Sequence, residues 1–170
     1  MEKLRIASTR LQWLVIVFMF LTPLAVVVSV MTQEWAELLN LPTGIQLNPS
    51  RITGLGLLVM IGLGSVTALS HLVAFWFLYR LLGLYRKGII FAAENVAAIR
   101  LIGWALIAID VAQMLKIVIT GPILTYLKIT SPYGSVGIQI AFLIVGLFVV
   151  LVSYVIDMGR ELKEQDNLVI

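Results

Sequence analysis

The stretch Gly103–Thr120, GWALIAIDVAQMLKIVIT, is long and apolar enough to cross a lipid bilayer as a helix. A spanning helix needs about 20 mostly apolar residues. A carboxyl group nevertheless stands in the middle of this stretch, at Asp110. An ionised carboxylate at that depth costs at least about 2.5 kcal/mol, so we expect Asp110 to face other helices rather than lipid. The stretch therefore predicts both a membrane helix and a protein interior that shelters an acid.

The composition indicates that the whole chain is a membrane protein. Of its 170 residues, 61% are hydrophobic and 12% are charged, whereas a soluble domain carries about 25% charged residues. The chain has no cysteine and one histidine, which excludes thiolate chemistry and a His–His metal site within one chain. The net charge of +3 does not indicate direct nucleic-acid binding, because the basic residues cluster at the ends of apolar segments.

Four segments are predicted to span the bilayer as one domain: about 11–31, 52–79, 97–119 and 133–158. Lys and Arg are more frequent at the N-terminus, in the connection 80–96 and in the tail 159–170 than in the two opposite segments, which favours cytoplasmic termini. We therefore predict an all-α integral membrane bundle of four transmembrane helices with both termini cytoplasmic. No motif indicates a catalytic residue, a cofactor or a metal site.

The segment 32–51 is predicted to be an outer loop that begins with a short interfacial helix. Thr32 is a candidate N-cap for this helix. We expect the helix to lay an apolar stripe on the membrane surface. The residues of this stripe are Trp35, Leu38 and Leu39.

The depth of Asp110 in the membrane suggests His71 as its partner. Each residue lies nine or ten positions from the arginine that marks the inner edge of its segment, or about 14–15 Å inside that edge at 1.5 Å per residue. We predict a hydrogen-bonded His71–Asp110 pair, with Gln113 one turn outward. Lys116 is predicted to be a poorer partner, because it lies on another face and nearer the outer surface. The pair either fixes the helix register or binds a ligand or a proton.

Small residues predict close helix packing in the second segment, because they let helices approach one another in lipid. Gly64 and Ala68 lie four residues apart on one face. We interpret this face as a contact within the bundle, with the interface of a homo-oligomer as the alternative.

Two stretches carry a recognisable pattern. The first is Tyr85–Trp104, YRKGIIFAAENVAAIRLIGW, and the second is the tail 158–170, MGRELKEQDNLVI. The first combines a glycine, a hydrophobic-Phe step, a Glu-Asn pair, an arginine and an Ile-Gly step, at Gly88, Ile90-Phe91, Glu94-Asn95, Arg100 and Ile102-Gly103. Together the stretches resemble the inner connection and the ending of a bacterial membrane-protein family catalogued as domain of unknown function 2975.

The resemblance implies a multi-pass protein of the bacterial cytoplasmic (inner) membrane with no established enzymatic activity. Such proteins are often encoded beside a small helix-turn-helix regulator, which implies a cytoplasmic protein as a partner in addition to the lipid bilayer. The residues that we expect at this inner-face interaction are Arg86, Lys87, Phe91, Glu94, Asn95, Arg100 and Glu161.

Three functions fit these features. We favour a non-enzymatic regulatory or interaction protein that presents its inner connection and its tail to a cytoplasmic partner. One alternative is a small transporter or proton-coupled carrier that uses Asp110 and His71. The other is an accessory subunit of a larger membrane complex.

Overall fold

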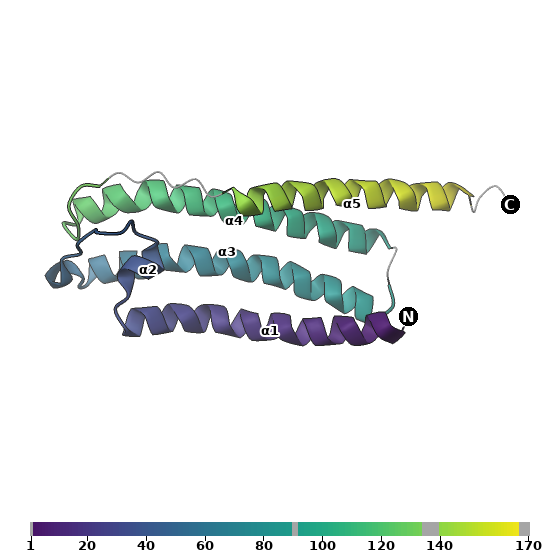
Figure 1. The fold of residues 1–170 in the computed structure, drawn as a ribbon, viewed down its shortest axis with the longest axis horizontal. Helices are drawn as coiled ribbons and strands as arrows, with labels where there is room; N and C mark the ends of the chain where they lie inside the picture. The colour runs from purple at the N-terminus through teal and green to yellow at the C-terminus, as the bar shows by residue number, and fades with distance from the viewer. Residues whose placement is uncertain (1, 90–91, 134–139, 167–170) are drawn as a thin grey trace.

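The computed structural model describes residues 2–89, 92–133 and 140–166, which form helices joined by loops (Figure 1). The helices are α1 (Glu2–Met31), α2 (Trp35–Leu39), the 3-10 turn η1 (Pro49–Arg51), α3 (Leu55–Arg86), α4 (Ala93–Tyr126) and α5 (Ala141–Asp166). Four of them, α1, α3, α4 and α5, are long and apolar enough to cross a membrane. The predicted all-α fold with four candidate spans is confirmed, and the chain has the features of a multi-pass membrane protein.

The long helices form a row. Helix α1 packs against α3, α3 against α4, and α4 against α5. Figure 1 shows both termini at one end of the molecule, and we call this the terminal end. The opposite end, which we call the loop end, holds residues 32–54 and 127–133. An even number of antiparallel helices returns the chain to the end at which it started.

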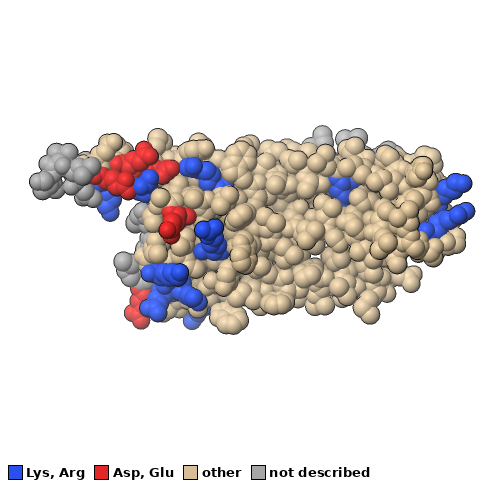
Figure 2. All heavy atoms as spheres, turned by 180° about the vertical axis from the view of Figure 1, so that it is seen from behind, with Lys and Arg blue, Asp and Glu red and all other residues tan. Residues whose placement is uncertain are grey.

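The sides of the row are apolar and exposed, as expected for surfaces that face lipid. Large side chains such as Phe20, Leu58 and Phe148 are 74%, 67% and 64% exposed. Figure 2 shows Lys and Arg mainly at the two ends of one face, with the visible acidic side chains at the terminal end. Such a wide apolar surface would cause the protein to aggregate in water. Between its charged ends, it is suited to burial in the hydrocarbon core of a bilayer.

All four long helices extend beyond the predicted spans at one end or both, since hydropathy detects only their apolar sections. Helix α1 begins at Glu2, α3 continues to Arg86 and α4 begins at Ala93. The added ends contain Lys, Arg, Glu and Ala, which are good helix formers in water. The fourth segment also starts later than predicted, because Tyr133 is not helical and α5 begins at Ala141. Helix α5 thus starts about half way along α4 and extends past the other helices at the terminal end (Figure 1).

The short helix α2 lies where the sequence predicts it, but it packs inside the protein. Trp35 and Leu39 are 7% and 1% exposed and belong to a buried cluster with Met60, Leu124 and Ile129. The apolar stripe is therefore covered by α3 and α4 rather than by the membrane surface. The predicted N-cap is also wrong, since α2 begins after Glu34 and the Thr32 hydroxyl donates back to the Val28 carbonyl of α1.

The Gly64 part of the predicted oligomer face is occupied within the chain. A Cβ atom at Gly64 would lie 2.5 Å from Cγ of Leu38, so the α2 side chain fills the space above the glycine. Gly64 is buried by this contact. The contact at Gly64 thus lies within the chain, as the favoured interpretation of this face has it, and a homo-oligomer interface that includes Gly64 would have to displace α2.

Candidate functional site

Asp110 caps the start of α5. It is fully buried, and its Oδ2 accepts a hydrogen bond of 2.7 Å from the backbone N–H of Leu143. Leu143 is the third residue of α5, where helix N–H groups have no partner within their own helix. An N-cap side chain usually supplies the acceptor, but the residue before α5 is the apolar Ile140. Asp110, from the neighbouring helix α4, takes over that role.

The position of this cap explains the acid in an apolar stretch. Asp110 lies ten residues from Arg100, or about 15 Å along α4, which places the start of α5 at the level of the bilayer interior. Water is scarce at that depth, so an N–H group without an acceptor would be costly there. A carboxylate at the positive end of the helix dipole is also electrostatically favourable.

His71 does not form the predicted hydrogen bond with Asp110. Its Nδ1 lies 2.7 Å from the carbonyl oxygen of Thr67, one turn earlier in α3, so that this nitrogen is the donor. Its ring meets the ring of Phe142 edge-on, with 6.0 Å between the centroids. His71 and Asp110 therefore contact neighbouring residues in the first turn of α5. The predicted pair is absent because His71 Nδ1 donates within its own helix, while Asp110 Oδ2 accepts from the backbone of α5.

A second polar cluster joins α3 to α4 through Thr67. The Thr67 Oγ1 accepts hydrogen bonds from Nζ of Lys116 at 2.8 Å and from Nε2 of Gln113 at 3.0 Å. Lys116 and Gln113 are 3% and 7% exposed. With its amide oriented so that Nδ2 donates to the Glu37 carbonyl, Asn40 accepts from Lys116 at 3.2 Å. We call Thr67, Gln113 and Lys116 the α3–α4 cluster.

Lys116 is a buried cation with neutral partners. The ion pairs of the described residues join Arg100 and Arg160 to Asp157 and Glu164, and none includes Lys116. Sequence reasoning assigned little to Lys116 and did not consider Thr67. The available signal for Thr67 was its hydroxyl, which lies one turn from His71 on the same face of α3. Which residue of α4 this hydroxyl contacts depends on helix packing, which the sequence does not specify.

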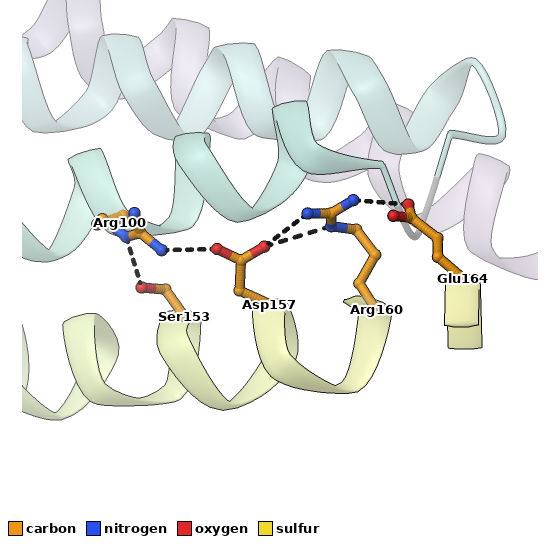
Figure 3. A network of polar contacts seen from close by, with 5 residues as sticks. All are labelled: Arg100, Ser153, Asp157, Arg160 and Glu164. Carbon is orange, nitrogen blue, oxygen red and sulfur yellow. Dashed lines mark hydrogen bonds and ion pairs between the residues drawn. The ribbon is translucent and has the colours of Figure 1, made fainter. Parts of the chain in front are cut away.

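A polar network at the terminal end holds α5 against α4 (Figure 3). Arg100 of α4 pairs with Asp157 of α5 at 3.1 Å and donates to the Ser153 hydroxyl at 3.3 Å. Its guanidinium carbon also lies 4.2 Å from the ring centroid of Tyr154. Asp157 pairs in turn with Arg160, which pairs with Glu164 at 2.6 Å. The network connects two helices and continues along α5.

The residues predicted for the inner-face interaction have different environments. Four of them are exposed at the terminal end: Arg86, Lys87, Glu94 and Glu161. Asn95 is only 2% exposed, and its Nδ2 donates to the Ile89 carbonyl at 2.6 Å, so it holds the connection in place rather than facing a partner. Arg100 is engaged in the network of Figure 3. Phe91 lies outside the described residues.

The buried polar groups can hold helices together, but three of their atoms have no hydrogen-bond partner among the described residues: Asn95 Oδ1, Asp110 Oδ1 and the Tyr133 hydroxyl. Asp110 Oδ1 is buried and has no hydrogen-bond partner among the described residues. Within the same part of the chain, no group of three or more acidic or histidine side chains could hold a metal ion. The unpaired oxygen is therefore chemically suited to a proton or to a donor group of a small molecule.

Comparisons with known proteins support the resemblance seen in the sequence. Neither the curated proteins nor the solved structures gave a match to the chain. The family model described as "Protein of unknown function (DUF2975)" matches residues 7–170, which is nearly the whole chain. The chain, with its row of four apolar helices and its acid-capped α5, therefore belongs to the DUF2975 family.

Proposed function

We propose that this protein is a non-enzymatic interaction protein of a bacterial inner membrane, and that its terminal end faces a cytoplasmic partner. The observation that carries the proposal is the projection of α5 beyond the ends of the other helices (Figure 1). We call residues 159–166 the α5 arm. Leu162 of the arm is 63% exposed, as is the side chain of Glu164. The arm thus offers apolar and acidic groups to a soluble protein.

The arm is held in a defined direction. Arg160 bonds to Asp157 one turn before it and to Glu164 one turn after it, and Asp157 bonds to Arg100 of α4 (Figure 3). Partly exposed ion pairs contribute little to stability one by one. The Arg100–Asp157 pair nevertheless joins α5 to α4 just before the arm, and the two pairs of Arg160 support the helical conformation of the arm itself. A segment that is already ordered loses less conformational entropy when a partner binds.

The charge distribution supports a cytoplasmic terminal end. Lys3, Arg5 and Arg10 lie in the first turns of α1, and Arg86 and Lys87 lie at the end of α3. Positive residues beside spanning helices favour the cytoplasmic side. The family resemblance implies a helix-turn-helix regulator as the partner, and such proteins have a basic surface that complements Glu161, which is exposed on the arm.

Photo-crosslinking in native membranes tests the proposal. A crosslinking amino acid placed at Glu161 or Leu162 should give a protein adduct that mass spectrometry can identify. The same amino acid at Tyr126, which is 85% exposed at the loop end, is the matched control. Adducts with lipid alone at 161 and 162, or identical adducts at all three positions, would contradict an interaction through the arm.

A small proton-coupled carrier is the second candidate, and the unpaired Oδ1 of Asp110 favours it. A buried carboxyl group with a free oxygen can take up and release a proton. Asp110→Asn separates the two functions in proteoliposomes that contain a pH-sensitive dye. If the protein is a carrier, the wild type should show proton flux and the folded Asp110→Asn variant should show none. If Asp110 is purely structural, the wild type itself should show no proton flux.

A further inference from the structure

A basic groove lies at the terminal end, between the first turn of α1 and the last turn of α3. Its charged lining residues are Arg5, Arg86 and Lys87, together with one acid, Glu2. The ion pairs of the described residues involve none of these cations. Figure 2 shows Lys and Arg gathered at this end of the molecule. The groove therefore holds three positive charges and one negative charge, and none of the three cations forms an ion pair among the described residues.

An apolar groove lies farther along the same two helices. Ile16, Met19 and Phe20 of α1 form one wall, and Trp76 and Tyr79 of α3 form the other. The rings of Trp76 and Tyr79 are stacked, with 6.1 Å between their centroids. Phe20 and Trp76 are 74% and 56% exposed. The groove thus opens onto the lipid-facing surface of the row.

The two grooves lie on the same side of the contact between α1 and α3. Arg5 and Ile16 are eleven residues apart, close to three full turns, and Arg86 and Tyr79 are seven apart, close to two. Helix geometry places the grooves about 10–17 Å apart along the helix axes. One leaflet of the hydrocarbon core is about 15 Å thick, so an acyl chain whose headgroup lies in the basic groove reaches the apolar one.

We propose that the α1–α3 contact is a binding site for one anionic phospholipid. Arg5, Arg86 and Lys87 bind the headgroup phosphate, and an acyl chain lies along Phe20 and Trp76. Three findings point to this occupant: the excess of positive charge, the apolar continuation on the same side, and the position at the end of the spanning helices, where headgroups lie. Basic pockets between membrane helices are known to hold such headgroups. The proposal does not depend on the α5 arm or on its partner.

Native mass spectrometry of the purified full chain tests the headgroup site. The probes are phosphatidylglycerol, phosphatidylcholine of the same chain length, and inorganic phosphate. The double variant Arg5→Gln/Arg86→Gln should retain phosphatidylglycerol about 30-fold more weakly than the wild type, because each lost charge weakens binding about fivefold. Arg51→Gln/Lys128→Gln removes two exposed charges at the loop end and should retain the lipid as the wild type does.

The acyl-chain part has its own variant. Trp76→Ala should weaken retention of long-chain phosphatidylglycerol and leave that of its dihexanoyl analogue unchanged. In the wild type, added salt should also weaken phosphatidylglycerol retention, because exposed charges are screened. This measurement uses the wild type alone and so does not depend on whether a variant folds.

Three results would overturn the proposal. The first is equal retention of phosphatidylglycerol and phosphatidylcholine by the wild type. The second is unchanged retention of phosphatidylglycerol by Arg5→Gln/Arg86→Gln. The third is displacement of the lipid by inorganic phosphate at equal concentration, which would make the basic groove a site for a soluble anion.

Discussion

Asp110 and Leu143 are joined by a 2.7 Å hydrogen bond from a backbone N–H group to a carboxylate oxygen, between two different helices. The bond allows α5 to begin beside the middle of α4 instead of at the end of the bundle. It also satisfies one oxygen of an acid that would otherwise be costly at that depth. The cap and the acid thus depend on each other.

Leucine in place of Asp110 should destabilise the protein, whereas asparagine should have little effect. Asp110→Asn keeps a neutral oxygen acceptor for Leu143, but Asp110→Leu leaves the N–H group without one, at a cost of about 1–3 kcal/mol. Equilibrium unfolding in mixed detergent micelles measures the difference. Val111→Leu, a substitution at an exposed neighbour, is the control. If Asp110→Leu proves as stable as this control, the cap does not explain where α5 starts.

Alanine at Gly146 should force α4 and α5 apart. A Cβ there would lie 2.6 Å from the Gly103 carbonyl oxygen, and one at Gly103 would lie 2.9 Å from the Gly146 carbonyl oxygen. Backbone atoms cannot rotate away as a side chain can, so we expect a loss of about 1–3 kcal/mol in the free energy of unfolding.

Gly62→Ala is the matched control for this prediction. A Cβ at Gly62, inside α3, meets nothing within 4 Å. The exchange should therefore be neutral or should stabilise the helix by up to about 1 kcal/mol. Equal destabilisation by Gly62→Ala and Gly146→Ala would show that alanine is tolerated poorly for a reason other than the helix contact.

Thr67 and Lys116 should be energetically coupled. Thr67→Val removes the hydroxyl that accepts from the buried ammonium group and should cost about 1–3 kcal/mol. Lys116→Met should be near neutral, because the lost hydrogen bonds are offset by removal of a buried charge that has no ionic partner among the described residues and is costly to desolvate. The double variant should lose less stability than the sum of the single losses. A coupling energy below about 0.5 kcal/mol would show that the two groups act independently.

Trp35→Ala should destabilise the protein strongly and thereby distinguish a buried α2 from a surface helix. Trp35 is 7% exposed, whereas Trp13 of α1 is 66% exposed. Removal of a buried tryptophan side chain costs about 3–5 kcal/mol. Trp13→Ala should change the unfolding midpoint only slightly. Similar midpoints for the two variants would place α2 at the membrane surface after all.

The number of long helices could be predicted from local sequence, but the polar contacts could not. Hydropathy within a window of about 20 residues is enough to locate spanning helices, and the four apolar segments indeed lie within or overlap α1, α3, α4 and α5. The His71–Asp110 bond was predicted from depth alone. Depth does not specify which group on the neighbouring helix is nearer, and a backbone N–H of α5 proved to be the nearer one.

Two further errors have the same origin. Trp35 and Leu39 have the spacing of a surface stripe, yet the same spacing serves a helix that packs on α3. Asn95 stands among charged residues in a predicted connection, but its side chain donates to the Ile89 carbonyl and is buried. Periodicity and composition identify the apolar or polar character of a face and do not identify what covers it.

The sequence by itself determined that this chain forms four apolar helices with a protected acid in the third, since those properties follow from residues close together in the chain. Only the tertiary structure decided that Asp110 caps α5, that Thr67 binds Lys116 and that α2 is buried. Each of these contacts joins segments far apart in sequence, and several use backbone groups, which every residue carries and which leave no trace in the amino-acid pattern.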